Sequence, residues 1–141
     1  MEKRKVQVVI FHYAKDNKKH FLLLKMNESR GFFWQNVTGG VEKDEDFEDA
    51  AIREVIEETA ITDEQILRLC SSTMEFSFHD QWGNDVIEKV FFLQTKDKWN
   101  VKIDPNEHCE FKWLSEDEIG PTSVHYSSNY EALNKAIQYD D

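Results

Sequence analysis

At Asp46 the hydrophobic pattern of this 141-residue chain changes from strand-like to helical. Apolar residues then recur at steps of one, three and four: Phe47, Ala50, Ala51, Ile52, Val55 and Ile56. Asp46 is suited to cap this helix, with Asp49 as a weak capping-box partner, and we expect the helix to end near Thr59. Six other segments read as strands, namely residues 6–13, 20–26, 33–37, 66–78, 86–95 and 109–114. A second helix is predicted over 130–139, capped by Ser127, Ser128 or Asn129.

This order of elements limits the fold. Two helices are too few to cover both faces of a wholly parallel sheet as regular crossovers. We therefore expect an α+β fold, with a mixed β-sheet sandwiched between helices. The sequence contains no repeat, low-complexity tract or linker, so residues 1–141 are expected to form a single domain.

The charge, the cysteines and the lack of long apolar segments limit the partners and the cellular location that we expect for this protein. The formal net charge is −11, from 28 acidic and 17 basic residues, which argues against binding along a nucleic-acid backbone. It leaves open the binding of one anionic end group through metal ions. Cys70 and Cys109 have no metal-ligand spacing and are expected to be reduced thiols of a cytoplasmic protein. We see no signal peptide and no segment long enough to cross a bilayer, so no membrane partner is expected.

The acidic side of the first predicted helix is a candidate metal site. Glu54, Glu57 and Glu58 stand at i, i+3 and i+4, so a helix places them on one face. Like charges at this spacing repel, and they also lie near the helix C-terminus, where the helix dipole disfavours anions. Divalent cations such as Mg²⁺, which binds oxygen ligands and shares them with phosphates, would relieve this repulsion. The alternative is a solvated acidic face without a ligand.

The residues around this face favour the metal site. Gly39 and Gly40 precede the helix and allow the backbone to approach an anion or to expose a carbonyl ligand. Glu45 lies eight residues before Arg53, and an ion pair between them would hold the glycine loop against the helix.

Residues 39–61 resemble the box motif of the Nudix family, G-x5-E-x7-R-E-U-x-E-E-x-G-U, where U is a bulky aliphatic residue. The matching residues are Gly39, Glu45, Arg53, Glu54, Val55, Glu57, Glu58 and Ile61. The single departure is Ala60, where the motif has glycine. Ala60 would cost stability if the position requires a positive φ, but it replaces no ligand side chain.

The resemblance implies a Nudix-type α/β/α sandwich and hydrolysis of a diphosphate linkage by a metal-activated water. Glu54, Glu57, Glu58 and the Gly39 carbonyl match the family's metal ligands, with Mg²⁺ as the cofactor and Mn²⁺ as a substitute. Glu45 and Arg53 match its supporting ion pair. The family often draws one further acid from outside the box, and we expect Glu107 as catalytic base or extra ligand, with Glu110 in reserve.

Looser similarities point to one branch of the family, small bacterial pyrophosphohydrolases acting on nucleoside triphosphates and dihydroneopterin triphosphate. They lie in residues 33–39, 107–108, 111–114 and 127–129. Rings and amides within these segments or directly next to them are candidates for binding a base or pterin: Phe32, Phe33, Trp34, Gln35, Tyr126 and Asn129. The aromatic residues could instead be core residues.

Two other functions stay open. The same box and metals would serve removal of pyrophosphate from the 5′ end of triphosphorylated RNA. A catalytically silent Nudix domain that senses nucleotides is disfavoured, because all four box glutamates are present.

Overall fold

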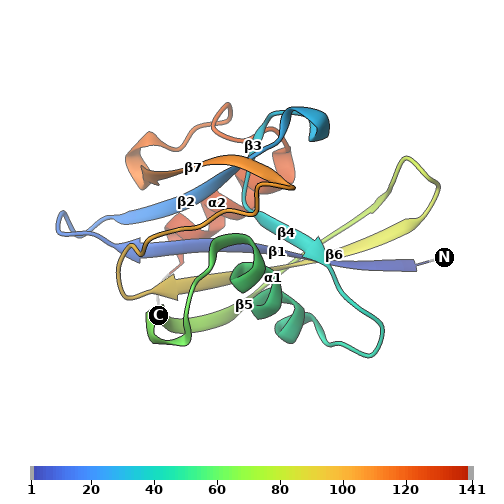
Figure 1. Cartoon of the computed structure of the whole chain (residues 1–141), viewed down its shortest axis with the longest axis horizontal. Helices are drawn as coiled ribbons and strands as arrows, with labels where there is room; N and C mark the ends of the chain where they lie inside the picture. Colours follow the sequence, from blue (N-terminus) through green and yellow to red (C-terminus); the bar gives the residue numbers. More distant parts are fainter. Residues whose placement is uncertain (1, 140–141) are drawn as a thin grey trace.

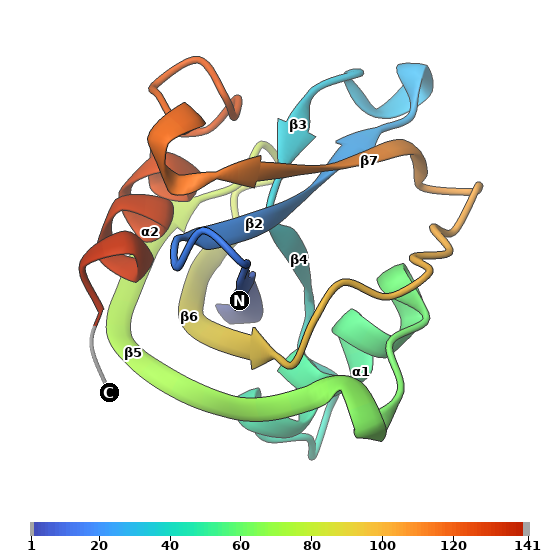
Figure 2. The ribbon, with the colours of Figure 1, turned by 90° about the vertical axis from the view of Figure 1, so that its left-hand side faces the viewer.

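The first strand, β1 (Glu2–Tyr13), is the centre of a seven-stranded mixed sheet. On one edge it pairs antiparallel with β2 (Lys19–Met26) and with β4 (Val37–Gly40), and on the other it pairs parallel with β6 (Asp85–Thr95). The sheet continues from β6 to β5 (Ile66–His79), and from β2 to β3 (Trp34–Gln35) and β7 (His108–Ser115). The structure, a computed structural model, describes residues 2–139 and shows the sheet strongly curled (Figure 2).

One helix covers each side of this sheet (Figure 1). α1 (Phe47–Thr59) contributes Ala50, Ala51 and Val55 to a core with β1, β2 and β6. α2 (Ser127–Gln138) buries Ala132, Leu133 and Ala136 in a second core against the other side. The predicted α+β sandwich is therefore confirmed. Neither helix in residues 2–139 has the length and apolar character needed to cross a membrane.

α1 begins and ends as the sequence predicts. The Asp46 side chain accepts a hydrogen bond from the Asp49 backbone N–H, and the helix ends at Thr59. Ala60 then adopts the left-handed conformation, with φ of 57°, and donates its N–H to the Ile56 carbonyl. A residue with a Cβ is strained in this conformation by about 1 kcal/mol. The family motif avoids this strain with glycine, whereas this chain has Ala60 at the same position.

Three sequence predictions need correction. Residues 33–37 do not form one strand, because β3 pairs with β2 and β4 pairs with β1, with Asn36 buried between them. The last helix has Tyr126 in the cap position and no capping side-chain hydrogen bond, so Ser127, Ser128 and Asn129 lie inside the helix. β1 also begins earlier than its apolar pattern suggests, because the polar residues from Glu2 pair with β6.

Candidate active site

The three glutamates of α1 lie together as the helical spacing predicts. Glu54, Glu57 and Glu58 each offer a carboxylate oxygen, and these oxygens lie within 4.8 Å of one another. Glu54 and Glu58 are buried and Glu57 is exposed. Charged carboxylates this close and partly out of water need a compensating positive charge.

A second acidic group shares Glu58 with the first. Glu58, Asp104 and Glu107 bring carboxylate oxygens within 4.8 Å of one another, the last two from the loop between β6 and β7. The Asp104 backbone carbonyl accepts a hydrogen bond from the Glu107 N–H, so one turn presents both side chains. Of the two acids proposed from outside the box, Glu107 lies at the cluster. Glu110 lies outside it and pairs with Lys25 at 3.5 Å.

Glu58 is the residue that the two acidic groups share, and its Oε2 is buried without a regular hydrogen bond. Glu58 Oε2 lies 2.8 Å from Nδ1 of the buried His108, but the two groups lack the alignment of a regular hydrogen bond. Burial alone would raise the pKa of Glu58, yet contacts with His108 and Glu107 outweigh it and lower this pKa. A hydrogen bond with Glu58, together with burial, raises the pKa of Glu107 to about 7.

Gly39 is needed because Glu54 lies directly against its backbone. A Cβ at Gly39 would stand 2.0 Å from Cδ and 2.3 Å from Oε2 of Glu54. At Gly40 a Cβ would meet nothing within 4 Å. The first glycine of the motif is therefore required by a close approach, and its carbonyl as a metal ligand stays a prediction.

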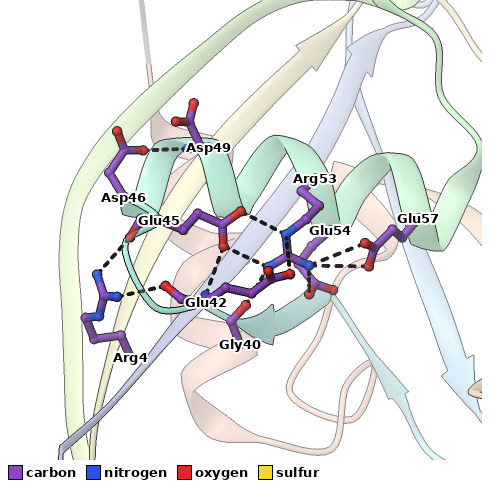
Figure 3. Close-up of polar contacts among 9 residues, drawn as sticks. All are labelled: Arg4, Gly40, Glu42, Glu45, Asp46, Asp49, Arg53, Glu54 and Glu57. Carbon is purple, nitrogen blue, oxygen red and sulfur yellow. Dashed lines mark hydrogen bonds and ion pairs between the residues drawn. The ribbon is translucent and has the colours of Figure 1, made fainter.

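The predicted ion pair between Glu45 and Arg53 is present and ties the glycine loop to α1 (Figure 3). Arg53 donates from Nε to Glu45, from Nη1 to Glu54 and from Nη2 to the Gly40 carbonyl, all at 2.8–2.9 Å. The bonds from Arg53 hold the pKa of Glu45 at about 2. Arg4 holds the same loop by donating to the Glu42 and Glu45 carbonyls.

The predicted ring-binding aromatics fall into two groups. Phe33 is stacked on His125 with ring centroids 4.4 Å apart and meets Tyr126 edge-on at 5.2 Å. Trp34 has other neighbours, with Lys112 Nζ 4.1 Å and Lys25 Nζ 5.8 Å from its ring centroid. Phe33 and Tyr126 therefore form one aromatic surface, and Trp34 is not part of it.

The two candidate amides are buried and already hydrogen-bonded. The Asn129 Oδ1 accepts from the Asn36 backbone N–H at 2.8 Å, and Asn129 is 2 % exposed. Gln35 donates to Met26 Sδ and Thr38 Oγ1. Both therefore support the turn between β3 and β4, and a contact of either with a substrate ring stays a prediction.

Asp104 and His108 belong to the site, although no sequence motif indicates a role for either. Asp104 stands in an Asp-Pro-Asn turn, which is a common loop pattern without chemical meaning. His108 follows Glu107 directly, but only the fold shows that its ring reaches Glu58. Arg30, from the short helix Glu28–Arg30, also reaches the cluster, with Nη2 3.5 Å from Glu107 Oε1.

The donor set fits hard divalent cations. Five carboxylates in two overlapping groups supply the oxygen ligands that such ions prefer. Oε2 of buried Glu58 makes no regular hydrogen bond, although His108 Nδ1 lies 2.8 Å away, and a buried carboxylate oxygen of this kind favours a further positive partner. The fold and this acidic helix, held under a glycine loop, define a class of metal-assisted hydrolases.

Comparisons with known proteins agree with this class. The NUDIX domain family matches residues 3–135. The dihydroneopterin triphosphate diphosphatase of Escherichia coli K12 is 32% identical over 122 residues, covering 79% of each chain. The RNA pyrophosphohydrolase of Pelagibacter ubique is 28% identical over 117 residues, covering 74% of this chain and 72% of that protein. The solved E. coli dihydroneopterin triphosphate pyrophosphohydrolase superposes with a TM-score of 0.78 at 28% identity, covering 96% and 94% of the two chains.

The chain therefore belongs to the Nudix family and is a Nudix hydrolase, as the box motif predicts.

Proposed function

We propose that this enzyme hydrolyses a nucleoside triphosphate-like substrate, a (d)NTP or dihydroneopterin triphosphate, to the monophosphate and pyrophosphate. The observation that carries the proposal is the pair of acidic groups sharing Glu58. Two neighbouring cation sites suit the cleavage of a phosphoric anhydride, because both the attacking and the leaving oxygen need stabilising. The similarity to the E. coli dihydroneopterin triphosphate enzyme supports the choice of substrate.

Each part of the cluster has a proposed role. Glu54, Glu57 and Glu58 hold Mg²⁺, or Mn²⁺ in its place, and the Gly39 carbonyl joins them. Asp104 and Glu107 hold a further ion with Glu58, or Glu107 serves as the base that accepts a proton from the attacking water. When bound, the ions neutralise charge on the phosphates and polarise the bond that breaks.

The surrounding residues keep these oxygens in place. Arg53 joins Glu54 to the loop through Glu45 and the Gly40 carbonyl. His108 lies against Glu58 from the side of β7 and limits its movement. Preorganised ligands of this kind lose little freedom on binding, which is what electrostatic catalysis requires.

The surface formed by Phe33, His125 and Tyr126 is the proposed platform for the base or pterin ring. Tyr126 is 50% exposed, so one ring face remains available for stacking. Gln35 and Asn129 are proposed to pair with the ring edge.

The test is a substrate panel assayed with Mg²⁺, comparing (d)NTPs, dihydroneopterin triphosphate, a dinucleoside polyphosphate and ADP-ribose. We expect pyrophosphate, not phosphate, from the triphosphates, and no turnover in excess EDTA. Full turnover in EDTA would refute the metal site, and release of phosphate alone would refute the position of cleavage.

A second candidate reaction is removal of pyrophosphate from triphosphorylated RNA ends. The relative from Pelagibacter ubique, named RNA pyrophosphohydrolase, favours it. Both reactions use substrates of the cell interior, which agrees with the free thiols of Cys70 and Cys109 and with a cytoplasmic location. Binding of nucleotides without any turnover would instead support a sensor.

A further inference from the structure

A groove of about 740 Å³ lies beside the acidic cluster and is not part of it. It is bounded by the start of β1, by the projecting hairpin of β5 and β6, and by the loop that leads from β4 to α1 (Figure 1). None of the predicted ligands of the metal or of the ring lines it. We call it the hairpin groove.

The hairpin groove is basic in a strongly acidic protein. Lys3, Arg4, Lys5 and Lys43 line it, against two acids, Glu2 and Asp80, so its lining has an excess of two positive charges. The whole chain has a net charge of −11. Such a local reversal of charge attracts an anion to this place.

Asp80 stays ionised and is held in place within the hairpin. Its carboxylate accepts hydrogen bonds from the Trp82 and Asn84 backbone N–H groups and from the Asn84 side chain, which keep its pKa at about 2 despite partial burial. Lys3 Nζ lies 3.5 Å from it. Asp80 therefore fixes the hairpin and pairs with Lys3, so the excess of two positive charges comes from Arg4, Lys5 and Lys43 against Glu2.

Two aromatic side chains are exposed at the same groove. Trp82 is 73% exposed and Phe78 is 42% exposed. The Lys3 ammonium lies 5.4 Å from the centroid of the Trp82 ring. Exposed aromatic rings interleaved with lysines are the surface that single-stranded nucleic acids use, since bases stack on the rings and phosphates pair with the cations.

The hairpin groove is connected to the catalytic loop. Gly40 lines it, and Lys5 is paired with Gly40 between β1 and β4. The neighbouring Gly39 contacts Glu54, and the Gly40 carbonyl accepts a hydrogen bond from Arg53. A chain whose 5′ phosphates lie at the glutamates could therefore continue into the groove.

We propose that the hairpin groove binds the nucleotides that follow the 5′-triphosphate end of a single-stranded RNA. The proposal rests on the proposed pyrophosphohydrolase function and concerns its RNA-end form. A free nucleotide has no chain beyond its first sugar and gains nothing from a second basic site. An oligoribonucleotide gains both stacking and phosphate contacts there.

The experiment compares a 5′-triphosphorylated hexaribonucleotide with ATP in the wild type and in two groove variants, Trp82→Ala and Lys3→Glu/Lys43→Glu. The matched control is Lys96→Glu/Lys135→Glu, which makes the same charge change at exposed positions elsewhere. The measured quantity is the ratio of kcat/KM for the hexamer to kcat/KM for ATP. In parallel, fluorescence anisotropy measures the Kd of a 5′-hydroxyl hexamer, which cannot be hydrolysed, and thermal unfolding checks that each variant folds.

We expect each groove variant to lower the kcat/KM ratio by about 10-fold and to raise the Kd of the hydroxyl hexamer by about 10-fold. The control variant should change either quantity by less than about 2-fold. Binding of the hexamer to the lysine variant should also depend less on salt. The slope of log Kd against log salt concentration should decrease by about 1.4, because two phosphate contacts are lost. If the groove variants were active and left both the Kd of the hexamer and the kcat/KM ratio unchanged, the proposed RNA site would be refuted. An equal loss of hexamer binding in the control Lys96→Glu/Lys135→Glu would also refute this site.

Failure of the underlying function gives a different result. If no triphosphate is hydrolysed at all, the proposed pyrophosphohydrolase function is wrong, whatever the anisotropy shows. Sedimentation distinguishes a third case, because a concentration-dependent dimer that dissociates in Trp82→Ala would mean that a second copy of the chain occupies the groove, and the RNA proposal would fall.

Discussion

Gly39→Ala should remove activity while leaving most of the fold intact. An added Cβ would stand 2.0 Å from Glu54 Cδ, 2.3 Å from Oε2 and 2.5 Å from Cγ, which are distances that nonbonded atoms cannot adopt. Either Glu54 or the backbone of β4 must move by more than 1 Å to restore ordinary contacts of about 3.5 Å. Because Glu54 is a proposed metal ligand bonded to Arg53, its displacement also disturbs the loop.

The expected size of the effect follows from the chemistry of the displaced group. A misplacement of about 1 Å in a catalytic constellation can cost about 10²-fold in rate, so we expect kcat to fall by that amount or more. Overpacking typically costs about 1–3 kcal/mol of stability, which urea denaturation would measure. A continuous pyrophosphate assay with a Mg²⁺ titration would show the loss of kcat and a raised Mg²⁺ requirement together.

Gly40→Ala is the matched control for this prediction. Its added Cβ meets nothing within 4 Å and the position is exposed, so turnover of a small triphosphate and the free energy of unfolding should stay close to those of the wild type. If Gly39→Ala retained near-normal kcat, the close contact with Glu54 would have no catalytic meaning. If both variants lost activity equally, flexibility of the loop and not the contact would be the cause.

Three further predictions concern Glu58, Arg53 and the buried His12. Glu58→Gln keeps the shape of the shared ligand and should lower kcat by about 10²-fold or more with the fold intact by circular dichroism; near-normal turnover would show that Glu58 is not a ligand. Arg53→Ala leaves Glu45 without its partner and should lower both the midpoint of thermal unfolding and kcat, whereas an unchanged midpoint would mean that the ion pair only orients the site. Burial lowers the pKa of His12 below its ordinary value of 6.5, so the contribution of this residue to the free energy of unfolding is present above pH 6.5 and is lost as pH falls below it. In urea denaturation the free energy of unfolding of the wild type, taken relative to that of His12→Phe, should therefore decrease as pH falls below 6.5, and a difference independent of pH would contradict the assignment.

The sequence predicted best what depends on neighbours along the chain. The helical spacing placed Glu54, Glu57 and Glu58 together, and the distance of eight residues between Glu45 and Arg53 anticipated their ion pair. These contacts are local, so the regular geometry of one helix and one loop is enough to derive them. The strand positions were also largely correct, because buried strands are marked by β-branched and aromatic residues.

Contacts between distant segments could not be derived in this way. Asp104 and His108 reach Glu58 only because the sheet brings β7 beside β2 and the loop before β7 over α1. The strand predicted over 33–37 failed for a similar reason, since Asn36 is drawn inward by Asn129 of α2. A residue whose partner lies 93 positions away carries no local signal of its role.

A net charge of −11 opposes binding along a nucleic-acid backbone only if that charge is spread evenly. At about 0.1 M salt, charges separated by more than about 10 Å are largely screened from one another, so each site is governed by its own neighbours. Here much of the acid excess lies between Glu42 and Glu58, where divalent cations would neutralise it, while four basic residues, Lys3, Arg4, Lys5 and Lys43, line the hairpin groove. The two regions meet at Gly40, which lines the groove and bonds to Arg53. Once ions neutralise the glutamates, a phosphate chain that leaves the cluster would meet the basic lining of the groove, and the total charge of the protein would have little effect on it.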